Sequence, residues 1–278
     1  MTPLQHWPLA ARAAISGVLT DIDDTLTTDG AITADALAAL SALRAAGLPV
    51  IAVTGRPVGW SEPFALRWPL NGIVAENGAV LLHAVPFNHQ KGLWSPYLLD
   101  SSLSKSYQQD ALTRSANAAH LQRVAARVLS EVPGALLARD SAGRETDIAI
   151  DHSEFTHLPP ERIAQAVSIM RAEGLTVSVS SIHINGWLGL HNKLQGADWA
   201  VRQLLQTDLA TQREKWVFIG DSTNDELMFE AFPNAIGVAN VQRFAAQLTH
   251  QPRYITTGER GAGFAEMVSA LLAARNQA

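Results

Sequence analysis

Two short apolar runs, one near each end of the chain, both finish in a cluster of aspartates. The first run, 17–22, is strand-like in its length and its β-branched content, and the second, 216–219, has the same character. In an open parallel sheet, ligands bind at the edge formed by the carboxyl ends of the strands. If these two strands are neighbours in one sheet, their acidic side chains converge on one small volume. The residues concerned are Asp21, Asp23, Asp221 and Asp225.

The segments around these runs alternate between strand and helix, which is the order of elements in a parallel sheet covered by helices. Runs at 49–53 and 72–75 predict two further buried strands. Thr33 is expected to cap a helix that runs to about Ala46 and is stopped by Gly47. The predicted apolar face of this helix consists of Leu37, Leu40 and Leu43.

The middle of the chain lacks this regular alternation. We expect an irregular stretch at 83–106 and then a module of helices and short strands, whose last strand, 175–184, leads into a hairpin at 185–189. The predicted fold class is therefore α/β, with a doubly wound, Rossmann-like parallel sheet as the core and an inserted α+β cap domain. The predicted segments are 1–82 and 190–278 for the core and 83–189 for the cap.

The composition excludes several classes of protein. The chain of 278 residues carries a net charge of −5, without the basic excess that a nucleic-acid binder usually shows. It contains no cysteine, so disulfides, thiolate metal sites and cysteine nucleophiles are excluded. Its first residues make a poor signal peptide, and no apolar run approaches the ~20 residues that cross a bilayer. We expect a cytoplasmic protein without nucleic-acid or membrane partners, and the sequence leaves its oligomeric state open.

The clustered aspartates also suit a particular chemistry. Four carboxylates in one pocket raise one another's pKa unless a cation offsets them, and oxygen ligands of this kind select a hard ion such as Mg²⁺. A carboxylate can attack phosphorus to form an aspartyl-phosphate, while a second carboxyl two residues later serves as acid and base. Either aspartate pattern alone fits a turn or a helix cap about as well as it fits a catalytic site. The two together, each closing an apolar strand, favour phosphoryl transfer.

Four motifs, in order, make the chain resemble the haloacid dehalogenase-like hydrolase superfamily. They are DIDDT at 21–25, Thr54 in VTGRP, Lys193 in HNKLQGA, and GDSTND at 220–225. The AENGA turn at 75–79 and the position of the insert resemble the subgroup with a C2-type cap. That subgroup holds trehalose-phosphate, sucrose-phosphate and mannosyl-3-phosphoglycerate phosphatases, and also phosphomannomutase. The resemblance covers both core segments, whereas over the cap it rests on position, length and the order of elements.

The resemblance implies a role for each matching aspartate. Asp21 would be the nucleophile and a ligand of Mg²⁺. Asp23 would be the general acid and base, with its backbone carbonyl on the metal. Asp221 would complete the metal site. Asn224 and Asp225 would orient that ligand and its waters.

The same resemblance assigns the residues around the phosphate. Thr54 would hydrogen-bond a phosphoryl oxygen, and Lys193 would balance the charge of the nucleophile and the phosphate. Gly55 and Arg56, from the family's TGR pattern, are candidate substrate contacts, although an ion pair with a structural carboxylate explains Arg56 about as well. Asp24, where many relatives carry Gly, Asn or Ser, is expected to be a turn residue.

The candidate residues for reading the leaving group lie at the end of the predicted cap. They are His183, Asn185 and Trp187, with His191 beside them. Trp187 could stack on a sugar face, and the others could bind hydroxyl groups. The alternatives are that Trp187 packs in the interior and that His183 and Asn185 face solvent.

These observations predict a Mg²⁺-dependent phosphoric monoester hydrolase that acts on a small phosphorylated metabolite, in particular a sugar phosphate. Two alternatives stay open. A phosphomutase of the phosphomannomutase type would use the same aspartyl-phosphate, and a non-catalytic sugar-phosphate binder would use the same fold.

Overall fold

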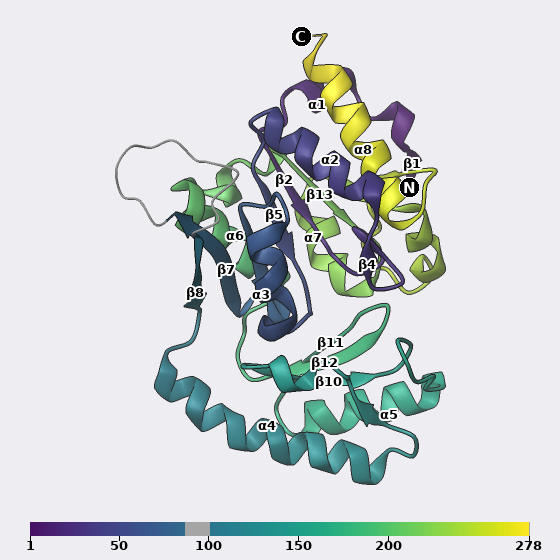
Figure 1. The fold of residues 1–278 in the computed structure, drawn as a ribbon. Helices are drawn as coiled ribbons and strands as arrows, with labels where there is room; N and C mark the ends of the chain where they lie inside the picture. Colours follow the sequence, from purple (N-terminus) through teal and green to yellow (C-terminus); the bar gives the residue numbers. More distant parts are fainter. Residues whose placement is uncertain (87–100, 278) are drawn as a thin grey trace.

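The computed structural model describes residues 1–86 and 101–277 (Figure 1). Its larger sheet has nine strands, and every neighbouring pair from β1 to β6 in the spatial order is parallel, while β7 and β8 are antiparallel additions at one edge. The strands in spatial order are β1 (Thr2–Pro3), β15 (Tyr254–Ile255), β14 (Asn234–Gly237), β13 (Trp216–Gly220), β2 (Gly17–Thr20), β5 (Val50–Val53), β6 (Gly72–Ala75), β7 (Val80–Pro86) and β8 (Ser101–Tyr107). The predicted α/β class with a mainly parallel central sheet is confirmed.

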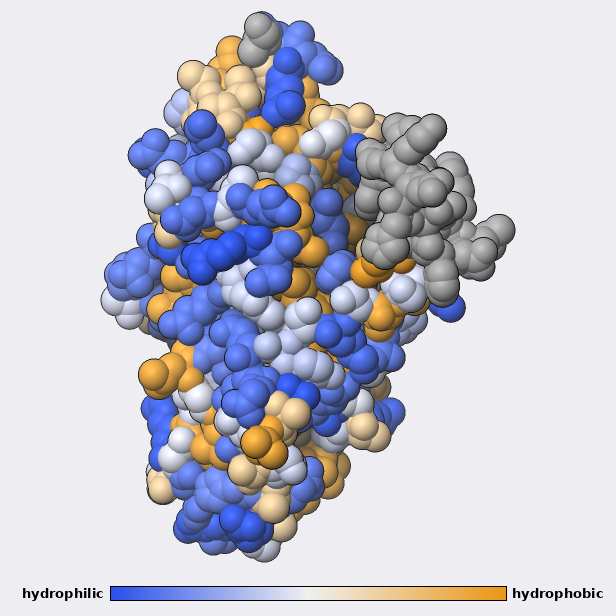
Figure 2. Space-filling model, turned by 90° about the vertical axis from the view of Figure 1, so that its left-hand side faces the viewer, coloured by the Kyte–Doolittle hydropathy of each residue, from blue (hydrophilic) through white to orange (hydrophobic). Residues whose placement is uncertain are grey.

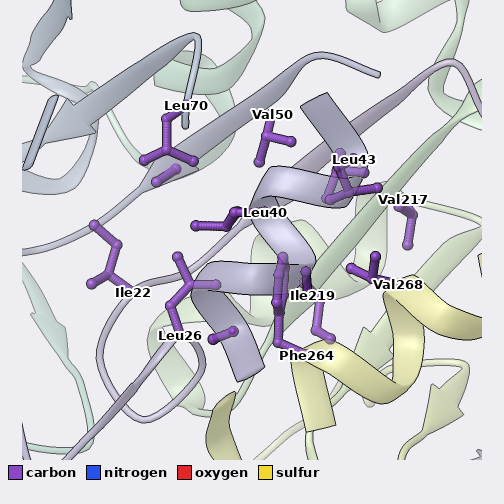
Figure 3. Packing of buried hydrophobic residues seen from close by; sticks show 14 of the residues in the cluster. Ile22, Leu26, Leu40, Leu43, Val50, Leu70, Val217, Ile219, Phe264 and Val268 are labelled. Carbon is purple, nitrogen blue, oxygen red and sulfur yellow. The ribbon is translucent and has the colours of Figure 1, made fainter. Parts of the chain in front are cut away.

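Helices cover both faces of this sheet, as a doubly wound fold requires. One face carries α1 (Leu9–Ala13), α2 (Ala34–Ala45), α3 (Val58–Arg67) and α8 (Arg260–Arg275). The other face carries α6 (Lys193–Leu205) and α7 (Glu226–Ala231). Figure 3 shows Leu40 and Leu43 of α2 meeting Phe264 and Val268 of α8 over the buried strands. Each face of the sheet therefore has its own apolar core, and the strand ends are held rigidly between the two.

Helix α2 shows how local sequence fixes these elements. The Thr33 side chain accepts a hydrogen bond from the backbone N–H of Ala36, and Gly47 beyond the helix has a φ of +71°, so both predicted signals are confirmed. The predicted apolar face is wrong in one member, because Leu37 is 38% exposed while Leu40 and Leu43 are buried.

A second, smaller sheet lies against the carboxyl edge of the large one (Figure 1). Its antiparallel strands in spatial order are β11 (Thr176–Val179), β12 (His183–Trp187), β10 (Asp147–Asp151) and β9 (Leu136–Leu137). Helices α4 (Ala111–Glu131) and α5 (Pro160–Ala172) cover its outer face and share a separate apolar core with it. A two-stranded ribbon, β3 (Thr27–Thr28) with β4 (Ala31–Ile32), projects from the loop after β2.

Two predictions about the middle of the chain are wrong. The hairpin expected at 185–189 is a turn at 180–182 instead, where the Ser180 hydroxyl accepts hydrogen bonds from the backbone N–H groups of Ile182 and His183. The ends of the stretch expected to be irregular, 83–86 and 101–106, belong to β7 and β8, while 87–100 lies outside the described residues.

The division into core and cap stays a proposal. Strand β8 lies within the segment assigned to the cap, yet it pairs with β7 in the large sheet.

None of the helices among the described residues is long and apolar enough to span a membrane. Figure 2 shows hydrophobic residues scattered among hydrophilic ones over the described part of one face.

Candidate active site

The strands that carry the two aspartate clusters are direct neighbours. Strand β2 pairs in parallel with β13, with Thr20 opposite Ile219, so both chains leave the sheet at the same edge. Asp21 and Asp221 follow these strands, and their carboxylates approach each other and that of Asp225, with one oxygen from each within 4.8 Å of the others. All three residues are buried. The convergence predicted from the sequence is thus found for three of the four aspartates.

Lys193 supplies the positive charge inside this cluster. It is the first residue of α6, whose N-cap Asn192 accepts a hydrogen bond from the backbone of Gln195. Its Nζ atom donates to Asp21 Oδ1 and to Asp225 Oδ1, each over 2.7 Å. The lysine side chain is only 3% exposed, so water screens these two ion pairs poorly.

Asp225 is held by the loop that it closes. Its Oδ2 atom accepts hydrogen bonds from the backbone N–H groups of Asp221 and Ser222, and Ser222 completes a capping box with it. Both carboxylate oxygens of Asp225 are therefore engaged, which suits an orienting role. Asn224 accepts a hydrogen bond from the Ser222 hydroxyl over 2.9 Å, and so steadies the same loop.

The electrostatics of the cluster call for a further cation. Burial raises the pKa of Asp21 to about 8, against the influence of Lys193 and with the help of Asp225 and Asp23. Burial, followed by the charges of Asp21 and Asp225, raises the pKa of Asp221 well above its ordinary value. Burial opposes the charge of Lys193 as well, but Asp21 and Asp225 outweigh it and raise the pKa of the lysine. One ammonium group does not neutralise three carboxylates.

The donor set fits a hard divalent cation. Asp221 Oδ1 is buried and has no hydrogen-bond partner within the described ranges, while Asp221 Oδ2 accepts a hydrogen bond from Asn240 over 3.2 Å. An unpartnered buried carboxylate oxygen is costly unless a cation contacts it. Carboxylate oxygens at this spacing are the ligands that Mg²⁺ prefers.

Asn240 is a residue of this site that sequence reasoning missed. Its side-chain amide donates to Asp221 and to the backbone carbonyl of Asp24, and its Oδ1 atom accepts from the backbone N–H of Arg260. It ties three loops of the carboxyl edge together. The signal that could have found it is its position just after β14, the next strand along the same edge.

Asp23 lies outside the three-carboxylate group and is paired with Arg56. Arg56 Nε lies 2.9 and 3.0 Å from the two Asp23 oxygens, and Nη2 lies 2.8 Å from Oδ1. The same guanidinium reaches the smaller sheet's loops, at 3.1 Å from Asp140 and 2.7 Å from Glu154. Thr54, also buried, accepts a hydrogen bond from the Arg56 backbone N–H over 3.0 Å. Arg56 therefore has the ion-pair role that the sequence left open.

Gly55 is a point of close approach between the two sheets. Its carbonyl accepts hydrogen bonds from Arg144 over 3.0 Å and from Asn185 over 3.3 Å. A Cβ atom at this position would lie 3.2 Å from Asn77 Oδ1 and 3.3 Å from Asn185 Oδ1, tighter than most such contacts. Asn185 also donates to the buried carboxylate of Asp147, so its amide is engaged in docking the two parts.

The other two candidates on β12 are buried rather than exposed to solvent. His183 lies 2.8 Å from Glu154 through Nε2 and is 2% exposed. Trp187 is 3% exposed, donates its indole N–H to the carbonyl of His191, and stacks on the His191 ring at 5.6 Å. The structure thus gives Trp187 an interior packing position, and the solvent-facing alternative for His183 and Asn185 is wrong.

A cavity of about 530 Å³ lies between the two parts of the molecule, and Asp23 and Arg56 are among the residues that line it. Trp60 of α3 and Arg260 of α8 line it from the larger sheet's side, and Phe155 lines it from the loop after β10 of the smaller sheet. This cavity is the space in which a group attached near Asp23 would lie.

Comparison with known proteins gives a consistent result. Residues 18–107 match the model of the family described as haloacid dehalogenase-like hydrolase. The comparison with curated proteins gave no match.

Solved structures with the same fold extend the likeness over nearly the whole chain. A protein from Thermoplasma acidophilum is 16% identical, with a TM-score of 0.66 over 93% of this chain and 98% of that one. The sucrose-phosphatase of Synechocystis, solved with sucrose and phosphate, is 15% identical, with a TM-score of 0.60 over 92% and 97%. A trehalose-6-phosphate phosphatase related protein is 18% identical, with a TM-score of 0.56 over 94% and 98%. The family match over 18–107 and the shared fold together confirm the predicted resemblance to the haloacid dehalogenase-like hydrolases.

Proposed function

We propose that the protein is a Mg²⁺-dependent phosphatase that hydrolyses a small phosphate monoester, in particular a sugar phosphate, through an aspartyl-phosphate at Asp21. The observation that carries this proposal is the position of Lys193, whose Nζ atom bridges Asp21 and Asp225 beside the unpartnered oxygen of Asp221. A nucleophilic carboxylate, a fixed ammonium group and a free metal-ligand oxygen at one sheet edge are what phosphoryl transfer requires.

The proposed reaction has two steps. An oxygen of Asp21 attacks phosphorus while the bond between phosphorus and the leaving oxygen breaks, and Asp23 protonates that oxygen. A water molecule then attacks the phosphorus of the aspartyl-phosphate and gives a proton to Asp23, the bond between phosphorus and the Asp21 oxygen breaks, and inorganic phosphate leaves with the Asp21 carboxylate restored. Lys193 stays beside Asp21 throughout and stabilises the charge that the phosphoryl oxygens spread over the site.

The metal would be held by Asp21 and Asp221, with the Asp23 backbone carbonyl as a further ligand. When bound, it would neutralise charge on the transferring phosphoryl group and help to orient it. Asn240 and Asp225 hold Asp221 in place by hydrogen bonds to its side chain and its backbone. Thr54, buried at the end of β5, supplies a hydroxyl group on the other side of Asp21.

The sugar phosphate is supported by the relatives and by the cavity. Two proteins of the same fold are named for sucrose phosphate and trehalose 6-phosphate. The cavity lined by Asp23 is large enough for a small leaving group, and Asp23 is the residue proposed to protonate the leaving oxygen.

The experiment that tests the proposal is a phosphate-release assay on the purified protein with Mg²⁺ over a panel of sugar phosphates and simple monoesters. We expect release that disappears with EDTA and returns when Mg²⁺ is restored. Isomerised sugar phosphate without net phosphate would instead identify a phosphomutase. Saturable binding of these compounds with no turnover would identify a non-catalytic binder.

A further inference from the structure

The cavity between core and cap differs from the phosphate site in its chemistry. Asp23, the proposed proton donor to the leaving oxygen, lines this cavity, whereas Lys193, Asp21 and Asp221 of the buried cluster do not. A leaving group protonated by Asp23 must occupy this space. The side chains that line the cavity therefore decide which leaving groups are accepted.

Two aromatic rings give the cavity apolar surface on opposite sides. Trp60 comes from α3 of the core and is half-buried, with the Arg56 guanidinium 5.0 Å from its ring. Phe155 comes from the loop after β10 and is 55% exposed although it lines the cavity. An aromatic side chain exposed at the mouth of a polar cavity is suited to packing on the apolar face of a sugar ring.

The cations that line the cavity are already paired with carboxylates. Arg56 lies within 3.1 Å of three acids, Asp23, Asp140 and Glu154. Arg260, the other cation in the described lining, is also paired with two carboxylates. It lies 3.0 Å from Asp24 and 3.1 Å from Asp29. Among the described lining residues, four carboxylates thus face two guanidinium groups.

This excess of negative charge works against an anionic leaving group. A second carboxylate or phosphate in the cavity would meet Asp24, Asp29 and Glu154 without a free cation in the described lining to receive it. Like charges brought this close repel, more strongly at Asp24 and Glu154, whose side chains are 20% and 17% exposed, than at Asp29, whose side chain is 86% exposed. Arg139, which is exposed, is stacked on the Phe155 ring at 3.7 Å and does not line the cavity.

We propose that the cavity between Trp60 and Phe155 binds the leaving group, and that it accepts an uncharged or amino-bearing sugar and rejects one that carries a carboxylate or a second phosphate. The inference rests on the proposed phosphatase activity and names the substrate class of that site. Phe155 and Asp29 are its specificity-determining residues.

The test uses three pyranose phosphates that differ in charge and share the position of the phosphate: glucose 1-phosphate, glucosamine 1-phosphate and glucuronate 1-phosphate. Glycerol 3-phosphate serves as a small acyclic monoester. Phosphate release is followed with Mg²⁺ at low ionic strength, because surface charges are screened by salt. We expect kcat/KM for the neutral and the amino sugar to exceed that for glucuronate 1-phosphate by about tenfold or more. Equal or better turnover of glucuronate 1-phosphate would overturn the inference.

Variants separate the charge from the fold. Asp29→Asn keeps a residue that tolerates the φ of +51° at this position and removes one carboxylate from Arg260. It should raise the ratio of kcat/KM for glucuronate 1-phosphate to kcat/KM for glucose 1-phosphate severalfold. Glu161→Gln, an equal change of charge at an exposed position in the first turn of α5, should leave this ratio unchanged. An equal rise in both variants would contradict the assignment.

The aromatic contact has its own readout. Phe155→Ala should raise KM for both neutral and amino hexose phosphates severalfold and leave glycerol 3-phosphate unchanged, while Phe155→Tyr should restore the hexose values. Unchanged hexose KM values in Phe155→Ala would refute the role of this ring. Phosphate release without discrimination by charge overturns only this inference, whereas no release from any of the four compounds overturns the proposed function as well.

Discussion

Arg56 and Glu154 join the core to the cap through an ion pair of 2.7 Å, and the same guanidinium holds Asp23. Burial alone would raise the pKa of Glu154, but hydrogen bonds from His183 and Arg56 hold it at about 2. Glu154 is therefore ionised at every pH at which the protein is expected to work. Arg56 therefore contacts both the proposed proton donor, Asp23, and the acid that joins the loops of the two sheets, Glu154.

Removing the charge of Glu154 should loosen this connection. In Glu154→Gln, Arg56 and His183 lose a charged partner, and we expect a loss of about 1–3 kcal/mol in the free energy of unfolding. The KM for the preferred substrate should rise severalfold, because the cap is docked less firmly. Urea denaturation and steady-state kinetics measure the two effects, with Glu161→Gln as the matched control. Equal behaviour of the two variants would show that the pair does not hold the cap.

Glu76 makes a second connection between the two parts. It is fully buried, and its carboxylate accepts hydrogen bonds from the backbone N–H groups of Val58, Glu145 and Thr146 and from the Thr146 hydroxyl. Glu76→Gln would turn an NH₂ group toward backbone donors, and we expect a loss of about 2–4 kcal/mol. The midpoint of urea denaturation checks this value. A loss in the free energy of unfolding no larger than that of the exposed substitution Glu161→Gln would refute this role of Glu76.

Stability should fall between pH 6.5 and about 4 because of His191. Burial lowers the pKa of this histidine from 6.5 to about 4, so the unfolded chain binds a proton in this range that the folded protein excludes. The free energy of unfolding contributed by His191 is then complete above pH 6.5 and decreases as the pH falls toward 4, by up to about 1.4 kcal/mol per unit. Urea denaturation at pH 7 and pH 5 should show a smaller decrease for His191→Gln than for the wild type. Equal decreases would exclude this histidine as the cause.

Asn240 should matter for the metal more than for the fold. Asn240→Ala removes the hydrogen bond to Asp221 Oδ2, so that both carboxylate oxygens of Asp221 lack a donor from this side. We expect the Mg²⁺ concentration for half-maximal activity to rise about 10–100-fold. Asn276→Ala, at the exposed end of α8, is the matched control and should leave it unchanged. If the folded Asn240→Ala variant needs the same Mg²⁺ concentration as the wild type, Asn240 has no role in the metal site.

The sequence predicts most reliably those elements whose ends carry chemical signals. Helix α2, Ala34–Ala45, lies close to its predicted bounds because Thr33 caps it and Gly47 follows its end. The neighbouring strands β2 and β13 follow from their apolar runs and from the acids at their ends. These local features were sufficient to predict that Asp21 and Asp221 lie close together.

The cap residues could not be predicted in the same way, because their positions depend on contacts between distant segments. The turn at Ser180 shifts the hairpin by several residues and places Trp187 inside a buried strand. The partners of Arg56 come from loops of the cap, and no spacing in the sequence relates Asp140 or Glu154 to it. Lining residues such as Phe155 likewise become visible only when the two sheets are in place.

The most direct test of the proposed mechanism is the turnover number of Asp21→Asn on the best sugar phosphate, with saturating Mg²⁺. The substitution keeps the size of the side chain and removes the nucleophilic carboxylate that Lys193 contacts at 2.7 Å. We predict a fall of about a thousandfold or more with the cooperative unfolding transition retained. Turnover within a fewfold of the wild type in a folded Asp21→Asn protein would contradict the assignment of Asp21 as the nucleophile.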